Sequence, residues 1–253
     1  MITIVMEGYG RAKKFFNANA EKYSQSRSHA EDSDLDILIE SLNLNSNMKG
    51  LDVGTGTGFT GLRLARKIDI VYAMDIAENM LKETSKLADK YGVQNIVTIK
   101  GSAESMPFDD SNFDIITSRR APHHFLDKAK FIDESYRTLK SGGMIGIDDM
   151  TCDQNYINYL NRLENIRDNS HMAAESPEGW IKLLKDAGFY DIKYHIYERR
   201  ISFAQWIYPV RENSIEGLDS YNYIINSGPF RDYIKWENNT FLKKWIIITG
   251  KKP

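Results

Sequence analysis

A glycine-rich segment is the part of this sequence whose composition most directly indicates chemistry. Four glycines fall within the eight residues from Gly54 to Gly61, directly after the apolar run 51–53. Glycines between a strand and a helix let backbone N–H groups approach a ligand closely, at the electropositive start of the helix. The segment therefore predicts a site for a nucleotide-type ligand.

The spacing of these glycines narrows the choice of ligand. Gly54, Gly56 and Gly58 read G-x-G-x-G, with Phe59 near the place where a dinucleotide-binding turn carries its third glycine. Asp52 stands in front of the turn, where a carboxylate would repel a diphosphate but could face the ammonium group of a methionine moiety. The pattern therefore disfavours a dinucleotide.

Two further segments follow predicted strands on the same edge. Asp75 comes about twenty residues after the glycine turn, where an acidic side chain can bind both hydroxyls of a ribose. A ribose is common to both kinds of ligand, so Asp75 does not separate them. The segment 101–104 ends the third predicted strand and is expected to lie beside the nucleotide.

Adjacent histidines supply the candidate acid–base groups. His123 and His124 follow the fourth predicted strand, where the carboxyl edge of a parallel sheet opens onto its ligand crevice. Adjacent side chains point in different directions, so we expect at most one imidazole to meet a substrate. The alternative is that one caps a loop and the other packs beneath it. Arg119 or Arg120 could bind an acidic group.

Other polar and aromatic residues have weaker functional interpretations. Asp148 and Asp149 could hold a divalent metal together with a histidine, but the spacing does not predict a metal site. His171 could line the pocket. The C-terminal third is rich in aromatic residues. These could form an acceptor pocket or a cation-binding box, but such residues more often pack in a core. They are Trp206, Tyr208, Tyr221, Tyr223, Phe230, Tyr233 and Trp236.

The elements that must position these residues alternate along the chain. Short β-rich runs are expected at 50–53, 70–74, 96–100, 113–117 and 144–147, and amphipathic helices at 30–44, 60–67, 77–91 and 128–139. Ser141 to Gly143 is expected to stop the last of these helices. The alternation predicts an α/β, doubly wound, mostly parallel sheet with helices on both faces.

The remainder of the chain is less regular. Helices are expected at 154–168 and from Ser176 to Gly188, with late strands at 192–197 and 241–249 and a poorly patterned stretch at 201–237. We predict a single domain, with an N-terminal helical lid at 1–45, a ligand-binding core at 46–150 and a C-terminal elaboration at 151–253.

Composition limits the setting. The net charge is −2 over 253 residues, with basic residues scattered as short pairs, so a nucleic-acid partner is disfavoured. The single cysteine, Cys152, cannot form an internal disulfide. No secretory signal or membrane span is apparent, and we expect a cytoplasmic protein of undetermined oligomeric state.

Taken together, the motifs resemble those of a known family. Asp52–Gly58, Asp75 with Met80, Ala103-Glu104 with 106–108, Phe113-Asp114 and Leu139–Gly143 are similar in order to the motif series of class I S-adenosylmethionine-dependent methyltransferases. The similarity covers roughly 15–147 and is greatest to the ubiquinone/menaquinone-biosynthesis-like group (methyltransferase type 11). It implies a seven-stranded Rossmann-like sheet.

The resemblance also implies roles for individual residues. The methionine end would lie near Asp52, Gly54 and Gly56, with Tyr23 and Arg27 closing over it; ribose would bind Asp75; and adenine would lie beside Ile76, Ser102, Ala103 and Glu104. The other residues expected at the cofactor site are Thr55, Gly58, Met80 and Arg119. Many relatives carry Asp where Ser102 stands, so a charged contact to the adenine amino group would be missing. Serine at this position therefore affects the expected affinity for the cofactor and not the expected identity of the cofactor.

The expected activity is methyl transfer from S-adenosylmethionine to a small-molecule acceptor by direct in-line displacement. His123 or His124 would be the catalytic base if the acceptor must lose a proton. The alternatives are a non-catalytic S-adenosylmethionine-binding protein, an NAD(P)-dependent reductase, and an RNA or protein methyltransferase. The sequence does not identify the acceptor or the atom that is methylated.

Overall fold

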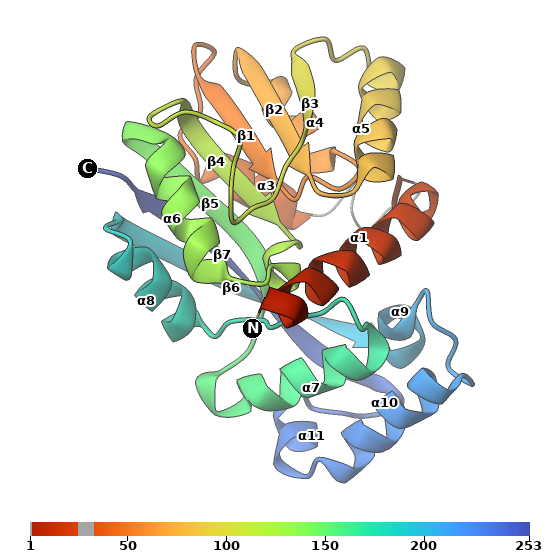
Figure 1. The fold of residues 1–253 in the computed structure, drawn as a ribbon. Helices are drawn as coiled ribbons and strands as arrows, with labels where there is room; N and C mark the ends of the chain where they lie inside the picture. The colour runs from red at the N-terminus through yellow and green to blue at the C-terminus, as the bar shows by residue number, and fades with distance from the viewer. Residues whose placement is uncertain (1, 25–32) are drawn as a thin grey trace.

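One seven-stranded sheet organises the molecule (Figure 1). The computed structural model describes the backbone of residues 2–24 and 33–253, and side chains in these ranges except at 2–9, 12, 22 and 23. The strand order is β3-β2-β1-β4-β5-β7-β6, and only β7 runs antiparallel to its neighbours. The strands are β1 (Lys49–Val53), β2 (Ile70–Asp75), β3 (Ile96–Lys100), β4 (Phe113–Arg119), β5 (Leu139–Thr151), β6 (Tyr190–Ser202) and β7 (Thr240–Lys251).

Helices cover both faces of this sheet. On one face, α3 and α4 bury Leu35, Ile39 and Leu64 against the strands, whereas on the other α6 and α8 bury Phe131 and Trp180. The doubly wound, mostly parallel fold is thereby confirmed. The helices are α1 (Ile2–Ser24), α3 (Ser33–Glu40), α4 (Phe59–Ala65), α5 (Glu78–Tyr91), η1 (Pro122–His124), α6 (Lys128–Thr138), η2 (Gln154–Tyr156), α7 (Ile157–Arg167), α8 (Pro177–Asp186), α9 (Phe203–Ile207), α10 (Ile215–Asn226) and α11 (Pro229–Tyr233).

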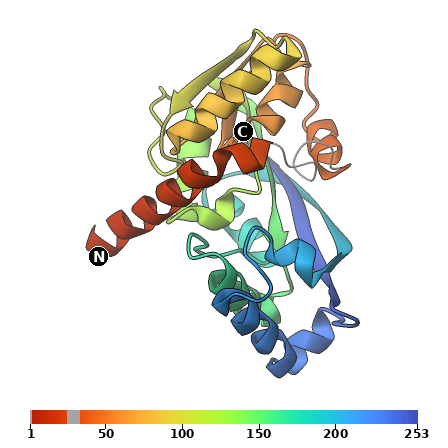
Figure 2. The same cartoon turned by 90° about the vertical axis from the view of Figure 1, so that its right-hand side faces the viewer.

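The N-terminal helix lies apart from the two helical layers. In both views α1 crosses between the sheet and the C-terminal helices (Figures 1 and 2). It packs on the start of α5, where the Asn17 side chain accepts a hydrogen bond from the backbone N–H of Asn79 at 2.9 Å. The helix expected at 30–44 is observed as α3, and residues 30–32 lie outside the described part of the chain.

Two details differ from the expected elements. Leu139 already pairs with Phe113, and the next pair joins Met144 to Ile115, so Lys140 to Gly143 form an irregularity within β5 instead of a separate turn. Residues 201–237, which lack a clear pattern, contain α9, α10 and α11. These helices are short or irregular in pattern, which explains why periodicity did not reveal them.

A second layer lies beyond the carboxyl edge of the sheet. It consists of α7, α9, α10 and α11, packed around Leu163, Trp206, Ile224, Phe230 and Phe241. The long strands β5, β6 and β7 extend into this layer (Figures 1 and 2). None of the helices that the structure describes combines the length and apolar character that a membrane crossing requires.

Candidate functional site

A cavity that opens to solvent lies at the carboxyl ends of β1, β2 and β4, beneath α1, and its space, with the adjoining solvent, is about 990 Å³. This edge is where ligands bind in open α/β sheets. Its lining includes the predicted residues Gly54, Thr55, Gly56, Asp75, Ile76, Met80, Ser102, Ala103, Glu104, Arg119 and His124. The structure therefore brings together most of the side chains expected from the sequence.

The three loop glycines have different structural roles. All have positive φ, but a Cβ on Gly54 would come within 2.6 Å of Ala121, and one on Gly58 within 2.5 Å of Thr84. A Cβ on Gly56 would meet nothing within 4 Å. Gly56 therefore offers backbone to the cavity, whereas Gly58 is not among the lining residues and permits close packing of the loop on α5.

Asp75 is held at the cavity by the backbone. Its Oδ2 accepts a hydrogen bond from the N–H of Gly56 at 2.9 Å, and its Oδ1 accepts one from Ala77 at 2.8 Å. Burial raises the pKa of this carboxyl, and these N–H groups oppose the effect. Each oxygen retains further acceptor capacity, as recognition of a ribose requires.

Asp52 lies outside the cavity lining. Its Oδ2 accepts hydrogen bonds from the Thr55 hydroxyl at 2.6 Å and the Gly61 N–H at 3.1 Å, and its Oδ1 accepts one from the Thr117 hydroxyl at 2.8 Å. Its expected contact with a methionine ammonium stays a prediction. The carboxylate joins the glycine loop to β4 and α4.

The adenine-side segment is tied to the turn after β4. The Ser102 hydroxyl donates to Glu104 Oε2 at 2.6 Å, and the backbone N–H of Leu126 donates to Glu104 Oε1 at 2.9 Å. Glu104 therefore fixes two loops that lie in different parts of the sequence. Phe16 on α1 closes the cavity beside Met80. The Tyr23 side chain and Arg27, both predicted to bind the methionine end, lie outside what the structure describes.

Arg119 and Arg120 line the cavity and share a carboxylate partner. Asp34, at the start of α3, contacts the Arg119 guanidinium at 2.9 Å and that of Arg120 at 3.3 Å. Asp148 lies 3.2 Å from Arg119 Nε and accepts from the Tyr197 hydroxyl at 3.0 Å. These contacts fix the cavity wall through elements that are distant in sequence.

Asp148 is therefore part of the arginine cluster. Within the described ranges, no three His, Cys, Asp or Glu side chains gather in an arrangement suited to a metal ion.

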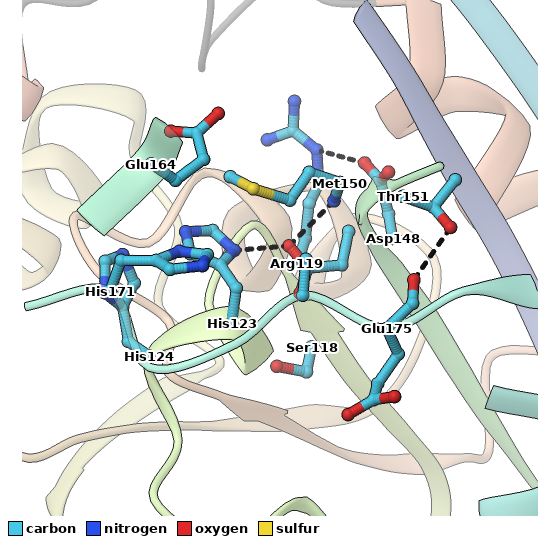
Figure 3. Close-up of polar contacts among 12 residues, drawn as sticks. Ser118, Arg119, His123, His124, Asp148, Met150, Thr151, Glu164, His171 and Glu175 are labelled. Atoms are coloured by element: carbon cyan, nitrogen blue, oxygen red, sulfur yellow. Dashed lines mark hydrogen bonds and ion pairs between the residues drawn. The ribbon is translucent and has the colours of Figure 1, made fainter. Parts of the chain in front are cut away.

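The predicted histidines lie on η1, with His171 beside them (Figure 3). His123 Nδ1 lies 2.5 Å from Asp149 Oδ1, which also accepts from the N–H of Met150, so the imidazole is the donor. Burial lowers the pKa of His123 to about 3 and raises that of Asp149 to about 6. The pair is therefore a neutral imidazole and a carboxylate at pH 7. The lining residues include His124 but not His123.

His124 is the imidazole that faces the cavity. Its Nδ1 lies 3.0 Å from the carbonyl oxygen of Ser170, and its ring meets the Phe16 ring edge-on at 4.8 Å between centroids. Burial and the neighbouring His123 lower its pKa to about 4, so this ring too is neutral at pH 7. The arrangement places an uncharged base beside the glycine loop.

His171 packs behind these two rings. Its ring stacks on that of His123 at 5.5 Å, and its Nε2 lies 2.9 Å from the side-chain oxygen of Asn161. It is not among the cavity-lining residues. The C-terminal aromatic residues are also absent from that lining, and Trp206 and Phe230 are buried in the second layer.

Sequence reasoning missed several residues at this site. Phe125 and Leu126 line the cavity, Ser170 contacts His124, and Asp168 accepts the hydrogen bond of the Ser170 hydroxyl. A single apolar residue after the histidine pair and a polar turn after α7 have no pattern that would distinguish them from ordinary loop residues.

Comparison with known proteins identifies the family. The sequence profile of a methyltransferase domain family matches residues 44–209 of this chain. The chain belongs to this family. It is thus a class I S-adenosylmethionine-dependent methyltransferase, as its motif series indicated.

Similar proteins support this assignment. The chain is 35% identical to the uncharacterized methyltransferase YcgJ of Bacillus subtilis over 171 residues, which cover 65% of this chain and 66% of YcgJ. A candidate methyltransferase of Bacillus halodurans, 30% identical, superposes with a TM-score of 0.82 over 88% of this chain and 100% of that one. The C-methyltransferase UbiE of a Marinomonas strain is 35% identical over 38% of this chain and 39% of UbiE. These similarities extend across the cofactor fold and leave the acceptor open.

Proposed function

We propose that this methyltransferase binds S-adenosylmethionine in the cavity and transfers the methyl group to a hydroxyl oxygen of a small molecule. One observation carries the proposal: a neutral imidazole, His124, lines the same cavity as the glycine loop, with its Nδ1 engaged by a carbonyl group. A hydroxyl group needs such a base because it is protonated at neutral pH.

The chemistry of the cavity wall fits the cofactor. Gly56 offers an open backbone position for the methionine end, and Asp75 offers carboxylate oxygens to the ribose hydroxyls. The segment 102–104 and Ile76 form the wall expected beside adenine. Arg119 would lie near the methionine carboxylate, for which a guanidinium is a suitable partner.

The residues of the chain account for the remaining steps. When bound, the cofactor supplies a methyl group activated by an adjacent sulfonium. Phe16 and Phe125 restrict water at the cavity. His124 would receive the acceptor's proton at Nε2 while the acceptor oxygen is held in line with the methyl carbon. The neutral state of His124 at pH 7 leaves this nitrogen ready to accept.

Other acceptor atoms and functions make different demands. UbiE is by name a C-methyltransferase, but its match covers only 38% of this chain. A non-catalytic cofactor-binding protein would have no need of an imidazole at the cavity. A nicotinamide-dependent reductase is disfavoured because the loop lacks the third glycine spacing of a dinucleotide site.

The cofactor assignment is tested by calorimetric titration with S-adenosylmethionine, S-adenosylhomocysteine and NADH. We expect micromolar binding of the first two and at least a tenfold loss of affinity in Asp75→Asn, because the amide removes the carboxylate charge. Asp69→Asn, at an exposed position, is the control. Binding of NADH alone, or an unaffected Asp75→Asn variant, would contradict the assignment.

The acceptor assignment is tested with matched small molecules that differ in one group. Phenols, anilines, thiophenols and aliphatic alcohols are incubated with the enzyme, and methylated products are identified by mass spectrometry. We expect O-methyl products that decrease at least a hundredfold in His124→Gln, since a positioned base contributes roughly this much. Products methylated only on carbon, nitrogen or sulfur would refute the proposal.

A further inference from the structure

The loop after α7 is fastened to the histidine turn. The backbone N–H groups of Met172 and Ala173 both donate to the carbonyl oxygen of His123, at 2.9 and 3.2 Å. The side-chain oxygen of Asn161 accepts from the N–H of Ala174 at 2.6 Å and lies 2.9 Å from His171 Nε2. The loop therefore has a defined position relative to η1 and can orient a side chain there.

The contact between this loop and His124 fixes which ring nitrogen carries the proton. His124 Nδ1 lies 3.0 Å from the carbonyl oxygen of Ser170. A carbonyl oxygen can only accept, so Nδ1 is the protonated nitrogen of the neutral ring. Nε2 then carries the lone pair, as a base at the cavity requires.

A buried carboxylate stands behind this contact. Asp168 Oδ1 accepts from the Ser170 hydroxyl at 2.6 Å and from the Ser170 N–H at 2.8 Å. Because the hydroxyl proton is directed to Asp168, the Ser170 oxygen can only accept from His124 Nδ1, 3.2 Å away. Burial would raise the pKa of Asp168, but His124 and the bonds from Ser170 outweigh it and lower the pKa, so the carboxyl is ionised.

We propose that Asp168 and Ser170 are positioning residues that act through Nδ1 of His124 to fix its tautomer and strengthen Nε2 as the proton acceptor. This inference rests on the proposed function, in which His124 is the base. Ser170 is not a nucleophile in this arrangement, because its hydroxyl proton is held by Asp168 and its oxygen faces the imidazole.

Charged and titratable neighbours of His124 determine how strongly the contacts from Asp168 through Ser170, here called the relay, affect its pKa. His124 is influenced by His123 on the same turn, by Asp149 on β5 and by Asp168 on the loop. Burial and His123 lower the pKa of His124, whereas Asp168, Ser170 and Asp149 raise it. Removing the Asp168 charge therefore leaves only Asp149 and the Ser170 backbone to oppose the effects that lower the pKa of His124.

The test is nitrogen-15 NMR of histidine-labelled enzyme, with His124 assigned by the His124→Gln spectrum. In the wild type we expect a neutral ring protonated at Nδ1. In Ser170→Ala and Asp168→Asn we expect the pKa of His124 to fall by about one, the scale of one lost charge-assisted contact. Ser170→Thr, which keeps the hydroxyl, should restore the wild-type value. Ser135→Ala removes a buried hydroxyl that donates to the carbonyl oxygen of Phe131 within α6, and it is the matched control.

The outcomes separate this inference from the proposed function. Each variant is also titrated with S-adenosylhomocysteine, which reports on the cofactor site. If the wild type fails to bind, the proposed function fails. If it binds but His124 is protonated at Nε2, or if its pKa is the same in all variants, the relay is refuted and the cofactor site stands. The wild-type tautomer is measured without Asp168→Asn, so misfolding of that variant would not leave the inference without a test.

Discussion

Replacing Asp52 by asparagine would test whether this carboxylate supports the fold or binds the cofactor. Asp52 is buried beneath the glycine loop and accepts hydrogen bonds from Thr55, Thr117 and Gly61. An asparagine oxygen can replace Oδ2, and the Thr117 hydroxyl can rotate to accept from the new amide. We therefore expect the variant to fold and to retain these contacts.

The magnitude follows from the pKa of Asp52. Burial raises it from 3.8 to about 6, against the three hydrogen bonds. The stabilisation from this group is fully present below pH 3.8 and is lost as the pH rises through 6. The complete loss is about 3 kcal/mol, of which about 2 kcal/mol falls between pH 4.5 and pH 7.5. Asparagine does not titrate, so the variant should gain about 2 kcal/mol relative to the wild type over that interval.

The assay is urea unfolding of both proteins at the two pH values, with exposed Asp69→Asn as the control. S-adenosylhomocysteine affinity is measured on the same samples and should change less than about threefold, because Asp52 lies outside the cavity lining. A stability difference between variant and wild type that is independent of pH would refute the argument. A tenfold loss of ligand affinity would instead return Asp52 to the role of a direct ligand.

Three further changes test other parts of the structure. Gly58→Ala should lose about 2 kcal/mol or more in thermal unfolding, because φ is +91° and the new methyl would lie 2.5 Å from Thr84; an unchanged Tm would show that the loop relaxes freely. Glu164→Gln should lose about 3 to 5 kcal/mol in denaturant unfolding, since it removes the charge that partners buried Lys243 at 2.6 Å and Arg167 at 2.8 Å; a loss below 1 kcal/mol would contradict this. Burial raises the pKa of Cys152 to about 12, so its thiol should react with a disulfide reagent only after denaturation, and rapid reaction of native enzyme would disprove its burial.

The cofactor half of the fold could be predicted because its local signals agree with one another. Runs such as 70–74 and 113–117 are buried or half-buried along their whole length and therefore read as continuous β-rich segments. Gly92, with φ of +66°, ends α5 where the amphipathic pattern ends. The C-terminal layer has weaker local signals, because α9 and α11 are only five residues long and too short to show a helical period.

The site was predictable where the signal lies within one segment. The glycine loop and Asp75 have fixed spacing from a strand, so their place at the cavity follows from topology. The partners of the histidines do not: Asp149 is 26 residues from His123 along the chain, and Ser170 is 46 from His124. The first pair forms when β5 aligns beside β4, and the second when the loop after α7 packs on η1, so no local pattern records them.

The position of β7 affects how the protein is made on the ribosome. It is translated after every other strand, yet it lies between β5 and β6. It also carries Lys243, the partner of buried Glu164 on α7. A nascent chain can thus assemble β1 to β5 and the glycine loop early, while β6 waits without a neighbouring strand. The second layer, whose core includes Phe241 of β7, is therefore completed last.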